Sequence, residues 1–74
     1  MKEKVLNVIN LIRAAKNLPV VGNINDNTRL REDLELTSFD MAEMTVRIED
    51  EFGIDIFEDG LVNTVGEIYA KLQK

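Results

Sequence analysis

Apolar residues recur at helical spacing in three separate segments, and this pattern limits the folds open to the chain more than any other feature. Repeats at positions i, i+3, i+4 and i+7 are typical of amphipathic helices that bury one face. The three sets are Val5, Val8, Ile9 and Ile12; Met41, Met44, Ile48 and Phe52; and Val65, Ile68, Tyr69 and Leu72. With 74 residues there is room for one small core. The sequence therefore predicts an all-α bundle forming a single domain over residues 1–74.

Flanking residues predict where the helices begin and end. We expect the first helix over residues 2–16 because Asn17 and Pro19 stop it, and the second over residues 38–51 because Gly53 suits a helix C-terminus. Capping residues mark two helix starts: Thr37 with Asp40 forms a capping box before the second helix, and Asn63 or Thr64 caps the last helix.

The remaining segments are expected to be a long loop and one minor element. Residues 18–37 are rich in Asn, Asp and Gly, which favour turns, so a long loop should join the first two helices. Its apolar residues should pin it to the core: Leu18, Val20, Val21, Leu30, Leu34 and Leu36. Residues 54–58 alternate only briefly in hydrophobicity and predict a short or irregular helix, which gives three main helices plus one short one.

Composition excludes several classes of function. The chain has neither Cys nor His, so thiolate nucleophiles, imidazole bases and zinc sites built on these residues are absent. Asn7, Asn10 and Arg13 interrupt the apolar part of the N-terminal segment, which argues against a signal peptide, and no apolar run approaches the length of a membrane span. We expect a soluble, cytoplasmic protein without a membrane partner.

Acidic residues gather in the middle of the chain. Residues 35–59 carry nine acidic residues and one base, Arg47, within a total formal charge of −5. Such a segment repels nucleic acid and attracts basic protein surfaces. Calcium ligation of the EF-hand type fails on spacing, because Thr28 and Leu34 stand where a loop starting at Asn23 needs Gly and Glu. No metal site is predicted.

The central segment "EDLELTSFDMAEMTVRIEDEFGIDI" resembles acyl carrier proteins and related phosphopantetheine-attachment domains. In that family a serine starts the second helix and an acidic amphipathic helix follows it. The resemblance implies that Ser38 bears 4′-phosphopantetheine, transferred from coenzyme A by a phosphopantetheinyl transferase, and that the arm's thiol carries acyl groups as thioesters. Taken alone, Ser38 would be read as an ordinary residue at a helix start. Thr37 can provide the cap of this helix, however, which leaves the Ser38 hydroxyl free.

The resemblance also implies a carrier rather than an enzyme, acting as a monomer in fatty-acid, polyketide or related lipid biosynthesis. Its partners would be acyltransferases, ketosynthases or acyl-activating ligases. If the Met and Phe stripe of the second helix faces inward, the opposite face mixes acidic and apolar residues suited to fast, reversible docking. The residues expected on this docking surface are Phe39, Asp40, Ala42, Glu43, Val46, Glu49 and Asp50.

Two positions depart from the family pattern, and two alternative functions follow. Thr37 replaces the usual Asp before the serine and Phe39 replaces the usual Leu after it, which indicates a specialised carrier with its own transferase and partners. Cargo could instead be peptidyl or aminoacyl groups of a non-ribosomal pathway. The third possibility is an unmodified adaptor that keeps the carrier fold only to bind proteins.

Overall fold

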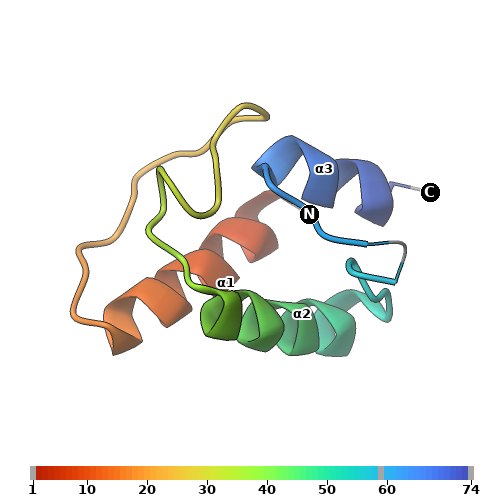
Figure 1. Cartoon of the computed structure of the whole chain (residues 1–74), viewed down its shortest axis with the longest axis horizontal. Helices are drawn as coiled ribbons and strands as arrows, with labels where there is room; N and C mark the ends of the chain where they lie inside the picture. Colours follow the sequence, from red (N-terminus) through yellow and green to blue (C-terminus); the bar gives the residue numbers. More distant parts are fainter. Residues whose placement is uncertain (1, 59, 74) are drawn as a thin grey trace.

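The computed structural model describes residues 2–58 and 60–73, and this part of the chain is all-helical, as predicted. Its three helices are α1 (Lys2–Ala15), α2 (Ser38–Phe52) and α3 (Val65–Leu72). Figure 1 shows α1 beside α2, α3 above them in this view, and the long loop passing from the end of α1 over the molecule to the start of α2. The predicted helix limits are therefore correct to within one residue for α1 and α2.

One hydrophobic core joins the three helices. The predicted apolar stripes supply most of it, and Met44, Ile48 and Ile68 are fully enclosed. Phe52 and Leu72, at the helix ends, are only half-buried. The core residues are Val5, Val8, Ile9, Ile12, Leu30, Leu34, Leu36, Met41, Met44, Ile48, Ile56, Val62, Val65, Ile68 and Tyr69.

The long loop is held to the core as expected at its second half but less so at its first. Leu30, Leu34 and Leu36 are buried, whereas Leu18 and Val21 are half-buried. Val20 was expected to pin the loop and is instead 70% exposed, so that expectation was wrong. Backbone hydrogen bonds and a buried arginine hold the loop in place. The hydrogen bonds join Leu30 N to Asn63 O (2.9 Å) and Val65 N to Thr28 O (2.9 Å); Arg13 Nη1 donates to Leu34 O (2.6 Å).

The expected short helix in residues 54–58 is not formed. Residues 56–58 make a turn, in which Glu58 N donates to Asp55 O at 3.3 Å. The Asp55 carboxylate also accepts from Phe57 N at 2.9 Å, and such a local side-chain bond favours a turn over a helix. Ile56 still anchors this segment because its side chain is fully buried. No helix in residues 2–58 or 60–73 has the length and apolarity needed to cross a membrane.

Candidate functional site

The start of α2 is fixed by a complete capping box. Thr37 has extended backbone angles, its hydroxyl accepts from Asp40 N at 3.1 Å, and the Asp40 carboxylate accepts from Thr37 N at 2.9 Å. This arrangement satisfies two backbone groups that a helix start would otherwise leave unpaired. The prediction that Thr37 provides the cap is confirmed. Ser38 is therefore the first helical residue, with its hydroxyl not needed for capping.

Ser38 is exposed, and its hydroxyl contacts a cation from the long loop. Arg31 Nη2 donates to Ser38 Oγ at 2.7 Å. The path of the loop brings these two residues, seven positions apart in the sequence, together. Residues 30–34 form a turn, Glu35 follows it with a φ of 59° in the left-handed region, and Leu36 N donates to Leu30 O at 3.0 Å. Nothing in the sequence indicated this contact, because it depends on the path of the loop.

Asp40 corrects the expected docking surface. Its carboxylate was placed on the outward face of α2, yet the residue is only 6% exposed. Lys16, at the end of α1, reaches across to it: Lys16 Nζ lies 2.6 Å from Asp40 Oδ2 and 2.6 Å from Glu35 O. Burial acts to raise the pKa of Asp40, but the hydrogen bonds from Lys16 and Thr37 outweigh it and hold this pKa below its ordinary value. Asp40 thus fixes the start of α2 from within.

The other residues expected to dock partners do lie on the outside of α2. Phe39 is 78% exposed and Val46 is 66% exposed, so the face carries large apolar side chains in contact with solvent. Glu43 is half-buried and pairs with Arg47 through a 3.0 Å contact between Oε2 and Nε. The corrected set, here called the α2 outer face, consists of Phe39, Ala42, Glu43, Val46, Glu49 and Asp50.

An apolar hollow of about 230 Å³ opens directly beside Ser38. It is lined by residues of α2, of the segment between α2 and α3, and of the long loop, which contributes Arg31. The remaining lining is apolar: Met41, Ala42, Phe57 and Leu61. A group attached to Ser38 would therefore find an apolar surface and one cation within reach of its first atoms.

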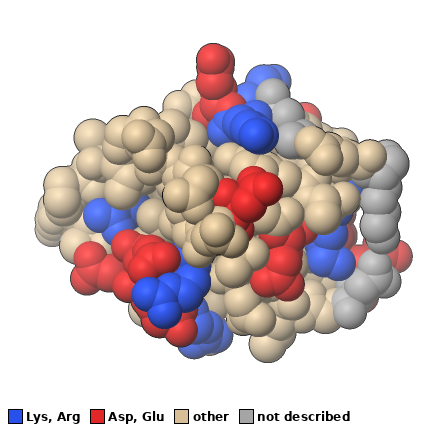
Figure 2. All heavy atoms as spheres, turned by 90° about the horizontal axis from the view of Figure 1, so that it is seen from above, with Lys and Arg blue, Asp and Glu red and all other residues tan. Residues whose placement is uncertain are grey.

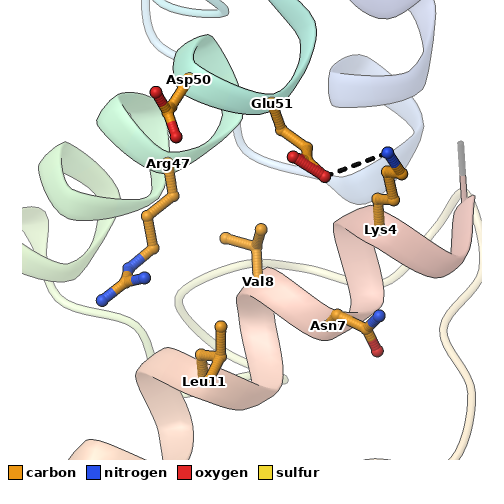
Figure 3. Close-up of a pocket in the computed structure, with 7 residues that line it drawn as sticks. All are labelled: Lys4, Asn7, Val8, Leu11, Arg47, Asp50 and Glu51. Carbon is orange, nitrogen blue, oxygen red and sulfur yellow. Dashed lines mark ion pairs between the residues drawn. The ribbon is translucent and has the colours of Figure 1, made fainter.

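A second hollow lies between α1 and α2 and does not include Ser38. Figure 3 shows Val8 and Leu11 of α1 facing Arg47 and Asp50 of α2 across it. Lys4 Nζ and Glu51 Oε1 form an ion pair of 3.0 Å at one end of this hollow (Figure 3). Ser38 does not line this second hollow, so the hollow is not part of the candidate site.

Charges of both signs are mixed on the face formed by the long loop and α3. Figure 2 views this face, and its acidic side chains lie interspersed with basic ones. The Arg29–Asp33 pair, with Nη2 and Oδ1 3.0 Å apart, belongs to the loop. No group of three or more acidic residues in the described ranges is placed to hold a metal ion.

Comparison with known proteins agrees with this geometry. The family model described as "Phosphopantetheine attachment site" matches residues 7–72. A curated relative, the acyl carrier protein of Lactobacillus acidophilus, is 34% identical over 53 residues, which is 69% of this chain and 66% of the relative. No solved structure matches the chain. The family match covers most of α1, the long loop, Ser38, α2 and α3, and so the chain belongs to the phosphopantetheine-attachment family of the acyl carrier proteins.

Proposed function

We propose that this chain is a carrier that holds acyl groups as thioesters on 4′-phosphopantetheine attached to Ser38. The observation that carries the proposal is the exposed Ser38 hydroxyl at the first residue of α2, inside the segment that the family model matches. Ser38 is also the only serine among the 74 residues. Once bound, the arm supplies the thiol that a chain without cysteine lacks.

The residues around Ser38 suit a phosphodiester followed by a mainly apolar arm. The N-terminus of a helix carries partial positive charge, which favours an attached phosphate. Arg31 adds a full positive charge 2.7 Å from the hydroxyl oxygen. The apolar lining beside it, from Met41, Phe57 and Leu61, is compatible with the arm and its cargo.

The proposed role is that of a substrate for other enzymes. Among the residues that the structure describes, the Ser38 hydroxyl contacts no catalytic base: its hydrogen-bond partner is the cation Arg31, and the chain has no histidine. The α2 outer face would present exposed apolar side chains and carboxylates to the transferase and to acyltransferases, ketosynthases or acyl-activating ligases. Such a surface combines rapid electrostatic encounter with easy release, as a shuttling carrier needs.

Intact-mass measurement tests the attachment. The protein is incubated with coenzyme A and a broad-specificity phosphopantetheinyl transferase, alongside Ser38→Ala and the control Thr45→Ala, which removes another α2 hydroxyl. The native chain and Thr45→Ala should each gain one phosphopantetheine, and Ser38→Ala none. If the native chain gains nothing, even with the transferase of its source organism, the carrier proposal fails and the adaptor alternative replaces it.

Cargo is tested separately once the arm is attached. Loading from acyl and aminoacyl coenzyme A derivatives, followed by transfer assays with partner enzymes, distinguishes acyl from aminoacyl carriage. We expect transfer of acyl groups. Preferential use of the aminoacyl forms by the partner enzymes would instead assign the chain to a non-ribosomal pathway.

A further inference from the structure

Arg31 differs from most other cations that the structure describes in having a neutral, exposed partner. Lys4, Lys16, Arg29 and Arg47 each pair with a carboxylate, and Arg13 is buried against backbone carbonyls. Lys2 lies over the ring of Tyr69. Within residues 2–58 and 60–73, no carboxylate lies within ion-pairing distance of Arg31, and its guanidinium donates to Ser38 Oγ. Arg31 is therefore positioned to bind an anionic group attached to the Ser38 hydroxyl.

We infer that Arg31 anchors the phosphodiester of the attached arm. The inference rests on the proposed function, because it needs the arm on Ser38. The phosphorus atom would be bonded directly to Ser38 Oγ, so its non-bridging oxygens would lie only two bonds from the atom that Arg31 now contacts at 2.7 Å. A small rotation of the arginine side chain brings Nη2, or both Nη groups, to these oxygens.

Attachment changes what Arg31 can bind. Before attachment its partner is a neutral hydroxyl oxygen, and afterwards it is an anionic group that accepts guanidinium bonds in a bidentate manner. The ester oxygen itself becomes a poorer acceptor than the hydroxyl was. Arg31 therefore interacts more strongly with the modified protein than with the unmodified one, and this difference is what would hold the phosphate in place.

An anchored phosphate also sets the direction of the arm. Arg31 and Ser38 both line the hollow, together with Met41, Ala42, Phe57 and Leu61. Fixing the phosphate here starts the arm over the hollow, which takes in only Ala42 of the α2 outer face. Partners that dock on Val46, Glu49 and Asp50, further along α2, would then meet a surface left clear by the arm.

Phosphorus NMR relaxation of the modified protein tests the anchor directly. A phosphate held by Arg31 tumbles with the protein and gives fast transverse relaxation, whereas a free one moves independently on a faster timescale. We expect Arg31→Gln to lose this fast relaxation and Arg31→Lys to recover part of it. The matched control is Arg29→Gln, which removes an equal charge from the same loop and should relax like the native chain.

The native protein provides a second test that needs no variant. The Arg31–phosphate contact is exposed, so it should weaken at about 1 M NaCl, where the Debye length is about 3 Å. Native relaxation should then approach that of Arg31→Gln. Slow relaxation in the native protein at low salt, unchanged by added salt, would overturn the inference, as would equal relaxation in the native chain and Arg31→Gln. Mass measurement beforehand separates this failure from failure of the proposed function, in which no arm is attached.

Discussion

The buried carboxylate of Asp40 should determine both the stability of the protein and its sensitivity to acid. This side chain is almost fully enclosed, and it accepts hydrogen bonds from Thr37 N at 2.9 Å and from Lys16 Nζ at 2.6 Å. Two replacements separate these contributions. Asp40→Ala removes both bonds, whereas Asp40→Asn keeps an acceptor for Thr37 N and removes only the charge that pairs with Lys16.

The expected costs follow from the hydrogen bonds that each replacement removes. Leaving Thr37 N–H without its cap costs about 1 kcal/mol. Removing the charge-assisted bond to Lys16 adds about 1–2 kcal/mol, at the low end because Lys16 is partly exposed and keeps its bond to Glu35 O. Asp40→Ala should therefore lose about 2–3 kcal/mol and Asp40→Asn about 1 kcal/mol, and each kcal/mol lowers Tm by about 4–8 °C in a domain of this size.

In acid, the native protein and Asp40→Asn should become equally stable. The pKa of Asp40 is lowered in the folded protein, so its contribution to stability is fully present above the unfolded-state pKa of about 3.9. That contribution is lost as pH falls through the folded-state pKa, because the protonated carboxyl then pairs no better than an amide. The two proteins should begin to converge in stability as pH falls below about 4, and should coincide below the folded-state pKa of Asp40, which lies lower still.

Urea denaturation followed by circular dichroism, at a series of pH values, measures these differences. The slope of unfolding free energy against urea should stay constant, so that shifts in midpoint report stability alone. A loss below about 0.5 kcal/mol in Asp40→Ala would refute the buried ion pair, since exposed pairs contribute that little. If Asp40→Asn remained less stable than the native protein by the same free energy in acid, the charge of Asp40 would not be the cause of the difference.

Three further predictions concern docking and packing. Charge reversal by Glu43→Lys and Asp50→Lys should slow transfer of the arm by the transferase at low salt, with Glu3→Lys on α1 as the control; kinetics unchanged at low ionic strength would contradict docking through α2. Ile48→Ala should cost about 2–5 kcal/mol in urea denaturation because the side chain is fully buried, and a cost under about 1 kcal/mol would refute the packing. Gly66→Ala should destabilise by about 1–3 kcal/mol, because its Cβ would lie 2.8 Å from a backbone oxygen of the long loop, and a thermal melt showing stabilisation would mean that the loop yields.

Much of the fold follows from local sequence patterns. The helical stripes predicted α1, α2 and α3 because each helix buries one face against the same core. Helix caps could be predicted for a similar reason, because their hydrogen bonds are local: the capping box of Thr37 with Asp40 was expected, as was a cap at Asn63 or Thr64 for the last helix. The structure shows that Thr64 is the cap and that Glu67 completes a second capping box. Ser38 could be singled out from its neighbours because the segment around it resembles carrier domains.

Features that depend on distant residues could not be predicted. Asp40 was expected to face outward because nothing in the α2 segment shows that Lys16 lies beside it. The contact of Arg31 with Ser38 depends on the path of the chain through the turn at residues 30–34 and Glu35, where a residue other than glycine adopts a left-handed conformation. Residues 54–58 were expected to form a short helix, but the structure has a turn there, in which the Asp55 carboxylate accepts from Phe57 N.

The residue that bears the arm can be identified by fragmenting the modified protein in the mass spectrometer. After modification with coenzyme A, backbone cleavage separates Thr37 from Ser38, its neighbour with a similar hydroxyl. We predict that the added phosphopantetheine remains with fragments that contain Ser38, since the Thr37 hydroxyl is engaged as the helix cap. An arm found on Thr37, or on any residue other than Ser38, would contradict the assignment of Ser38 as the attachment site.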